Sequence, residues 1–426
     1  MHLEKKTSAS FLVAALVLFV TSFYSMVVQA TPAFARQMGV NCMACHNQSV
    51  PMLNAFGRTF KASGYTMVGG DKSMIEGGSL GFGLPLAINA GVGIKAQYLS
   101  SDAVNKRDVL SIPSGSSIMV GGRIGENAGV HTLWNGDGLV HTQIHFSRPM
   151  SGGDRFGVAL AGSLGHGAFI ATEGYNTGLH KELQIFDNSA LSNAAQASGI
   201  GLAKGPTTTV TAYYNGNGLS LSGGARVLGY NSTFTNGGLD IDGSLGYVFR
   251  VAYDLPAMGG WNGTIGAYGV GGTTTGTTSK LLENTNSPLL NAPWANGVND
   301  HDVDSNGLDM QFQGQLAGLD TQVILNHVAS YELKISNPVN GMTMVDMDTS
   351  ATSLQAQTML NSAWGVRYGA MQFENNKNSM ADYDTYTLGL NYNYADNIRF
   401  SAEYTNVSPD MGDSYYEALL TTIIGF

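Results

Sequence analysis

The chain has 426 residues, of which 43% are hydrophobic and only 12% charged, and it contains 56 glycines. So few charges exclude an ordinary soluble surface, and the hydrophobic content excludes an intrinsically disordered chain. The formal net charge is −10, and an acidic chain of this kind favours cationic partners over nucleic acid.

Residues 1–30 have the pattern of a secretory signal peptide. Lys5 and Lys6 precede an apolar run over residues 11–20, and the segment ends in small residues up to Ala30, where a signal peptidase would cleave. The run is short for a membrane-spanning helix, so an uncleaved anchor is the less favoured alternative. Cleavage removes one acidic and two basic residues, which leaves 30 acidic and 19 basic residues and a net charge of −11.

Residues 42–46 read Cys-Met-Ala-Cys-His and include the only two cysteines of the chain. Two thiols at this spacing reach the two vinyl groups of a haem, and the following histidine supplies an imidazole to the iron. A zinc site would need more Cys or His nearby, but the next histidine is His131. A redox dithiol would need a βαβ context, which the pattern lacks. The motif therefore predicts one covalently attached haem c, held by Cys42, Cys45 and His46.

The haem segment is predicted to span residues 31–76 and to be helical. A turn of helix over residues 32–38 would place Phe34 beside the binding site. A segment of this size cannot bury a haem by itself, so we expect another part of the chain to enclose it.

A second helix is expected after His46, with Ser49 as N-cap, Pro51 as its first residue and Gly64 as its stop. Large apolar side chains recur every fourth residue along one face of this helix. We expect that face to cover the haem plane, and it consists of Met52, Phe56 and Phe60.

Two cations and one ligand complete the predicted site. Arg58 and Lys61 either pair with the haem propionates or form a solvated face. A thioether ligand would raise the reduction potential, and Met67 is the first choice for this sixth ligand, although Met also serves as a packing residue. The alternatives are Met74, Met52, Met38 or a histidine from the rest of the chain.

From residue 84 onward, apolar residues recur with period two, in segments of about ten residues separated by Gly, Asn, Asp and Ser. The clearest hairpin joins residues 385–394 to residues 399–404, with one apolar face that carries tyrosines towards its ends and one polar face. In an exported chain, such a face fits a lipid-facing surface better than the core of a soluble sandwich.

The last strand, residues 416–426, ends on Phe426, and a terminal Phe resembles the assembly signal of bacterial outer-membrane barrels. Residues 77–426 are therefore predicted to form an all-β transmembrane barrel of about 16 antiparallel strands, an even number, with the helical haem segment plugging its lumen. A closed barrel leaves no exposed edge in lipid. The other predicted strands are residues 84–99, 130–134, 139–146, 156–160, 207–214, 219–227, 245–253, 264–270, 308–316, 321–327, 353–360 and 364–373.

Three longer irregular stretches are predicted to be extracellular loops: residues 101–114, 174–205, with a short helix over residues 190–197, and 273–306. In the third stretch, side chains with oxygen atoms occur at alternate positions of residues 300–307, as at the start of a calcium-binding loop. With Asp302 as first ligand, however, the position of the bidentate Glu is occupied by Gln313. We therefore expect a solvated acidic loop that concentrates divalent cations electrostatically.

Three histidines lie on the same side of two predicted strands: His131, His141 and His145. If the intervening apolar residues face lipid, all three imidazoles point into the lumen. A turn at residues 135–138 makes the two strands neighbours, so His131 and His141 are expected side by side. These side chains either line the lumen or contact haem or a metal ion.

The segment over residues 32–65 resembles the fused monohaem cytochrome-porin family of bacterial outer membranes, which includes iron oxidases of iron-oxidising bacteria. The resemblance rests on the haem motif and on the residues after it: Pro51-x-Leu53-Asn54-x-Phe56-Gly57-Arg58-x-Phe60-Lys61-x-x-Gly64-Tyr65. The remainder of the chain matches the family in architecture, length and terminal Phe.

This resemblance implies an Fe(II) oxidoreductase in which a small cytochrome plugs an outer-membrane barrel. It would take electrons from extracellular Fe(II) and pass them to a periplasmic c-type cytochrome. Oxidation outside the cell has a chemical rationale, because Fe(III) is insoluble at neutral pH and only the electron need enter. The alternatives are a conduit for a different extracellular donor or acceptor, and a passive diffusion porin with a haem-bearing plug.

Overall fold

The structure is a computed structural model, and it describes residues 33–40, 44–46, 53–66, 74–75, 84–85, 89–103, 108–134, 139–163, 185–197, 207–228, 245–277, 298–336, 343–378, 381–395 and 397–425. The predicted signal peptide lies outside the described residues, as do Cys42, Met52, Met67 and Phe426.

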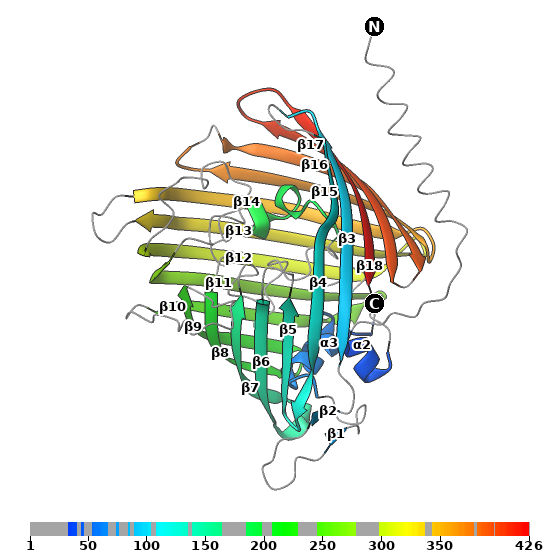
Figure 1. Cartoon of the computed structure of the whole chain (residues 1–426), viewed down its shortest axis with the longest axis vertical. Helices are drawn as coiled ribbons and strands as arrows, with labels where there is room; N and C mark the ends of the chain where they lie inside the picture. The colour runs from blue at the N-terminus through cyan, green and yellow to red at the C-terminus, as the bar shows by residue number, and fades with distance from the viewer. Residues whose placement is uncertain are drawn as a thin grey trace.

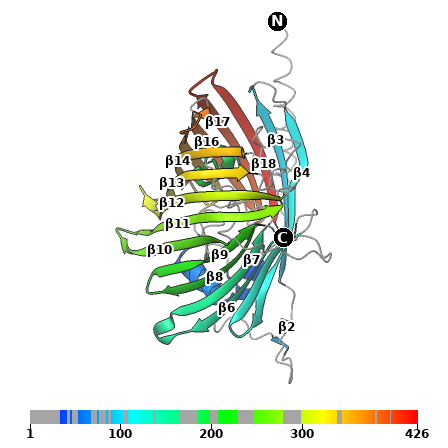
Figure 2. The same ribbon diagram turned by 90° about the vertical axis from the view of Figure 1, so that its left-hand side faces the viewer.

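Sixteen antiparallel strands within these residues form a closed barrel. Each strand pairs with its neighbours in sequence, and the last, β18 (Tyr415–Gly425), pairs with the first, β3 (Ala90–Ser101). Figures 1 and 2 both show β18 beside β3. The predicted barrel of about 16 strands is confirmed. The strands between these two are β4 (Val109–Gly125), β5 (Ala128–Trp134), β6 (Leu139–Pro149), β7 (Arg155–Ser163), β8 (Thr207–Gly216), β9 (Leu219–Leu228), β10 (Gly246–Met258), β11 (Trp261–Thr277), β12 (Val298–Leu316), β13 (Leu319–Ser336), β14 (Thr343–Met359), β15 (Trp364–Asn375), β16 (Tyr383–Ala395) and β17 (Ile398–Pro409).

The outer surface of the barrel is apolar and its inner surface polar, because side chains alternate across each strand. In β16, Leu388 is 64% exposed whereas the adjacent Thr387 is 2% exposed. In β18, Leu420 is exposed and Thr421 is buried in the same way. Closure also satisfies the backbone hydrogen bonds of every strand without water. These two features make the chain a membrane-spanning barrel of the bacterial outer membrane, as predicted.

The two-residue turns lie at one end of the barrel, because each follows an even-numbered strand. Residues 259–260 join β10 to β11, and residues 317–318 join β12 to β13. The opposite end carries the longer connections, of which residues 164–206, between β7 and β8, are the longest. Short turns face the periplasm in barrels of this type and long loops face the cell exterior. The short-turn end is therefore the periplasmic end.

The strand boundaries differ from the prediction in several places. The strand predicted over residues 84–99 begins in the barrel only at Ala90, and residues 84–85 pair outside the barrel sheet. β4 begins inside the segment expected to be a loop over residues 101–114, and its Gly- and Ser-rich sequence gives no clear alternation. β11 and β12 extend into the loop expected over residues 273–306, so the acidic residues 300–307 lie in a strand, and their prediction as a loop is wrong. Strands that project beyond the lipid need no apolar face, which is why the pattern underestimates their length.

The helices lie inside the barrel. α2 (Ala33–Met38), which confirms the predicted turn of helix, contacts β4, and α3 (Ala55–Ala62) contacts β6, β7 and β8 (Figure 1). We call the described part of residues 33–66 the plug. The short β1 (Met74–Ile75) and β2 (Leu84–Pro85) pair with each other outside the barrel sheet.

A second element enters the lumen from the longest connection, and we call residues 185–197 the inward segment. It consists of the 3-10 turn η6 (Ser189–Leu191) and α4 (Ala194–Ala197), and it contacts β13, β14 and β15. The predicted short helix is confirmed. The connection that carries it starts at the extracellular end, as predicted, but residues 185–197 fold inward against the inner wall. A further 3-10 turn, η3 (Ser151–Gly153), joins β6 to β7. None of the helices in the described part of the chain is long and apolar enough to cross a bilayer.

A cation introduced on the lipid-facing surface should destabilise the barrel. Leu388→Arg places a charge on the outward face in the middle of β16, which we expect to cost about 2–4 kcal/mol in the free energy of unfolding. Reversible unfolding in lipid vesicles measures this cost. Gln372→Arg, exposed near the extracellular end of β15, should cost about 1 kcal/mol or less, because the penalty falls with distance from the bilayer centre. Equal costs at the two positions would contradict the lipid-facing assignment.

Candidate functional site

Helix α3 begins and ends through two local signals. Its N-cap is Asn54, whose side-chain oxygen accepts a hydrogen bond from the backbone N–H of Gly57 at 2.9 Å. The predicted start at Ser49 and Pro51 is wrong, because the helix begins only after this cap; both residues lie outside the described part. Gly64 has a φ of +71°, which confirms it as the stop.

The same Asn54 holds the second half of the haem motif. Its side-chain amide donates hydrogen bonds to the carbonyl oxygens of Ala44 at 3.1 Å and His46 at 3.4 Å. Its backbone N–H donates to the carbonyl oxygen of Cys45 at 2.9 Å. Since Asn54 also caps α3, the position of the motif is fixed relative to that helix.

Gly57 allows α3 to approach the motif closely. A Cβ at this position would overlap the carbonyl oxygen of Cys45 and would lie 3.0 Å from Cδ2 of Leu53. The resemblance noted above includes a glycine here, and the structure gives the physical reason for it. The backbone of α3 at Gly57 lies directly against the backbone of Cys45, which leaves no room for a side chain.

Arg58 ties the plug to the barrel wall. Its guanidinium is ion-paired with Asp254 of β10 and donates hydrogen bonds to Thr264 of β11 at 3.0 Å and to the carbonyl oxygen of Leu53 at 2.7 Å. The arginine is 8% exposed and Lys61 is 7% exposed. The two cations predicted to pair with propionates are thus both buried between the plug and the barrel, and that predicted role stays a prediction.

The rest of α3 is seated on β6 to β8. Thr59 donates a hydrogen bond to the side-chain oxygen of Asn215 at 3.2 Å, beside the β8–β9 turn. The hydroxyl of Tyr213 donates to the carbonyl oxygen of Ala62 at 2.9 Å, and Ala62 packs with Ala159 and Ala161. These contacts hold α3 on the wall towards the periplasmic side of the lumen.

An aromatic cluster joins the two helices of the plug to the wall. Phe34 stacks on Tyr65 with ring centroids 4.6 Å apart and meets Phe60 edge-on at 5.5 Å. Tyr65 in turn meets His145 of β6 edge-on at 5.4 Å. Phe34 and Phe60 are thus both used in packing within the plug, and the predicted position of Phe34 beside the haem stays a prediction.

Phe56 differs from Phe60 because it is 38% exposed. It lines a hollow of about 290 Å³ between α3 and the ends of β10, β11 and β12. The hollow lies beside the two-residue turns and so opens at the periplasmic mouth. Its principal lining residues are Asn54, Phe56, Arg58, Leu255, Asn262 and Phe312.

The three histidines of β5 and β6 all face the lumen and are buried beneath the plug, as their alternation predicts. Nε2 of His141 lies 3.0 Å from Nδ1 of His131, which confirms that they are side by side. Gln143 bridges them to His145, because its amide nitrogen is 3.2 Å from His131 and its amide oxygen 3.1 Å from His145. The imidazoles are therefore hydrogen-bonded to one another and to Gln143 within the wall, and they meet the plug through ring contacts with Phe34 and Tyr65.

No group of three or more His, Cys, Asp or Glu side chains in the described residues is arranged to hold a metal ion. This holds for the three histidines and for the acidic residues of β12. In β12, Asp302 accepts a hydrogen bond from the hydroxyl of Thr273 at 2.5 Å, in keeping with a solvated strand surface. The side chain of Met74, one alternative sixth ligand, is not among those described.

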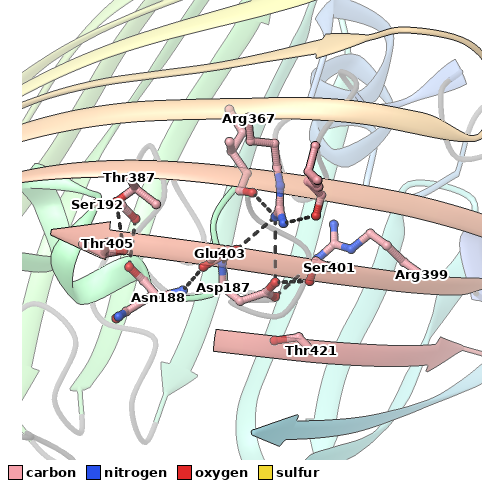
Figure 3. Close-up of polar contacts among 12 residues, drawn as sticks. Asp187, Asn188, Ser192, Arg367, Thr387, Arg399, Ser401, Glu403, Thr405 and Thr421 are labelled. Atoms are coloured by element: carbon pink, nitrogen blue, oxygen red, sulfur yellow. Dashed lines mark hydrogen bonds and ion pairs between the residues drawn. The ribbon is translucent and has the colours of Figure 1, made fainter. Parts of the chain in front are cut away.

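The inward segment is fixed by charges that the sequence analysis did not identify. Arg367 of β15 donates to the carbonyl oxygen of Ile185 at 2.5 Å and to Glu403 of β17 at 3.0 Å. Glu403 in turn accepts hydrogen bonds from the backbone N–H groups of Asp187 at 2.6 Å and Asn188 at 3.1 Å. Figure 3 shows these side chains converging between the segment and the wall.

A second set of contacts completes this attachment. Arg399 lies 3.3 Å from a carboxylate oxygen of Asp187, and Ser401 donates to its other oxygen at 2.7 Å (Figure 3). The signal that could have identified the cluster was present in the sequence. Arg367 and Glu403 occupy inward positions of predicted strands, where a charge needs a partner. The sequence could not show that the partner would come from the longest connection.

Comparisons with known proteins do not assign this chain to a protein family. No protein-family model matches the chain, and no curated protein matches it in sequence. The chain is similar to the solved structure of an anion-selective porin from Comamonas acidovorans, with 14% identity, a TM-score of 0.47 and coverage of 80% of this chain and 99% of that chain.

Two other solved structures are similar at the same level. OprB of Pseudomonas putida has 9% identity and a TM-score of 0.47, with 80% of this chain and 94% of that chain covered. A loop-deletion mutant of OmpT, an outer membrane protein of Vibrio cholerae, has 13% identity and a TM-score of 0.43, with 80% and 99% covered. Identities and scores this low carry no argument, so the fold rests on the closed strand order described above.

Removing the cation that ties the plug to the wall should loosen the plug. Arg58→Met leaves Asp254 facing the helix without its partner, and breaking one side of a buried pair costs about 3–5 kcal/mol, less where one partner is partly exposed. Native-state hydrogen exchange should show faster exchange in α3 than in the wild type, with the barrel strands unchanged. The double variant Arg58→Met/Asp254→Leu should regain part of the protection. Unchanged exchange in the single variant would show that this pair does not hold the plug.

Proposed function

We propose that the chain is an outer-membrane cytochrome that oxidises extracellular Fe(II) and passes the electron, through one covalently attached haem c, to a periplasmic c-type cytochrome. The barrel gives the location, the motif Cys42 to His46 gives the cofactor, and the resemblance to cytochrome-porins suggests the donor. Each of these three steps can be tested separately.

The observation that carries the proposal is the clamp on the haem motif. Asn54 and Gly57 hold the backbone of Cys45 and His46 against α3, and Arg58 ties that helix to the barrel wall. A short motif at the end of a signal-like segment would need no such anchoring if it were an accident. A haem attached there would be held in a fixed position inside the barrel.

The residues present fit a c-type haem. Cys45 and His46 stand at the spacing that a c-type haem requires, and no described residues group with them into a cluster of three or more ligands of the kind that holds zinc. Cys45 and His46 would hold the haem together with Cys42, which lies outside the described residues. Once bound, the haem would supply a one-electron redox centre whose potential depends on its axial ligands and burial.

The position of the motif favours a periplasmic electron acceptor. Asn54 and the exposed Phe56 line the hollow at the periplasmic mouth, and both belong to the turn of α3 next to the motif. A carrier docked at that mouth could approach the motif closely. Fe(II) would have to enter from the other end, and the net negative charge of the chain favours a divalent cation as substrate.

A visible spectrum of the oxidised protein in membranes, before and after anaerobic addition of Fe(II) as the sole reductant, tests the proposal. We expect a sharp band typical of a ferrous c-type cytochrome to grow after Fe(II) is added. Reduction by dithionite but not by Fe(II) would keep the cytochrome and favour a conduit for another donor or acceptor. The absence of a haem band with either reductant, together with ion conductance in planar bilayers, would favour the passive porin.

The close approach at Gly57 gives a test of the haem site that does not involve iron. Gly57→Ala should push α3 away from the Cys45 carbonyl and reduce the fraction of purified protein that carries covalent haem, measured by the pyridine haemochrome absorbance per chain. Gly125→Ala is the matched control, because its nearest contact would be an ordinary 3.7 Å from Ala128. Equal haem content in the two variants would show that this packing does not matter for attachment.

A further inference from the structure

Four arginine side chains of the described residues are buried, and one of them has no acceptor. Arg58 pairs with Asp254, Arg250 with Asp309, and Arg367 with Glu403 and Asp187. Arg226 of β9 is 0% exposed, yet none of its three guanidinium nitrogens has a hydrogen-bond partner. Of these four arginines, it is the only one to which no described residue offers a carboxylate.

The wall around Arg226 leaves room for its guanidinium. Its register partner on β10 is Gly246, and an ideal Cβ on that glycine would lie 3.2 Å from Nε and Nη2 of Arg226. The guanidinium therefore extends over a position that has no side chain. On the other side, its register partner is Thr209 of β8, which is 1% exposed.

The unpartnered donors lie together. The hydroxyls of Thr209 and of Thr211, two residues along the same inward face, are also buried without a hydrogen-bond partner. Gly224, the residue opposite Thr211, contributes no side chain. Two hydroxyls and a guanidinium thus converge on one region of the inner wall, and this region contains no carboxylate among the described contacts.

An isolated buried cation is costly, whereas a paired and hydrogen-bonded one is tolerated. Replacing a buried ion by an apolar side chain is often neutral or stabilising, so a retained unpaired arginine calls for a counter-anion. We propose that Arg226, with Thr209 and Thr211, forms a binding site for a small oxyanion, a carboxylate or a phosphate, on the inner wall of the barrel. The guanidinium fork matches the two oxygens of such a group, and the hydroxyls add donors.

The oxyanion at this site could come from either of two sources. One is a diffusible solute that enters the lumen. The other is a propionate of the haem proposed above, because Thr209 pairs with Ala161, against which Ala62 of the plug rests. The solute source does not depend on the proposed function; the propionate source does.

Equilibrium dialysis of the purified full chain against radiolabelled inorganic phosphate at low ionic strength tests the first source. We expect one saturable site per chain and an affinity about tenfold or more lower in Arg226→Gln, because a charge-assisted bidentate contact is lost. Thr209→Val, which keeps the charge, should weaken binding severalfold. Arg148→Gln removes an equal charge from the exposed outer surface of β6 and should leave binding unchanged.

The second source is tested on the same variants by redox titration of the haem. If a propionate occupies the site, the wild type does not bind phosphate, and the midpoint potential falls in Arg226→Gln but not in Arg148→Gln, because a nearby positive charge favours the reduced haem.

Either phosphate binding that depends on Arg226 or a midpoint potential that depends on Arg226 supports the anion site. If neither phosphate binding nor midpoint potential depends on Arg226, the proposal is overturned, and Arg226→Met should then unfold at a higher temperature than the wild type. If the protein lacks haem altogether, the phosphate result alone decides.

Discussion

The closure of one hydrogen-bonded ladder is the constraint on which this structure depends. In lipid, a strand edge with unpaired N–H and C=O groups costs several kcal/mol per group, so β18 must pair with β3. Closure then fixes which side chains face lipid and which face the lumen, because alternation leaves no other choice. The apolar Leu388 and the polar Thr387 occupy opposite sides for this reason. The plug and the inward segment both lie in the space that closure encloses.

Two elements occupy that space, and both are held by paired charges. The plug is tied to β10 through Arg58 and Asp254, and the inward segment is tied to β15 and β17 through Arg367 and Glu403. Such pairs gain little net stability over apolar packing, but they are costly to break and so define position. The plug lies at the periplasmic side over β4 to β8, and the inward segment lies against β13 to β15. The lumen is therefore partitioned by anchored segments.

This partition gives the proposed electron transfer a direction. The described half of the haem motif lies next to the N-terminal end of α3, and that end faces the periplasmic mouth. A periplasmic acceptor would meet the motif there, whereas a donor from outside must cross the outer part of the lumen. The proposed anion site at Arg226 lies on the wall beside the plug, two strands from Ala161. A passing solute and a cofactor attached to the plug would both come near it.

The sequence by itself determined the barrel, its approximate strand number and the lipid face, because period-two alternation is a local property of each strand. It also placed His131 beside His141, since a short turn makes their two strands neighbours. It did not show β4, whose glycines and serines carry no alternation, or that residues 300–307 continue a strand beyond the lipid. Only the tertiary structure decided that Arg58 pairs with Asp254, that Glu403 holds the inward segment, and that Arg226 has no partner. These contacts join residues far apart in sequence, and only closure of the barrel brings them together.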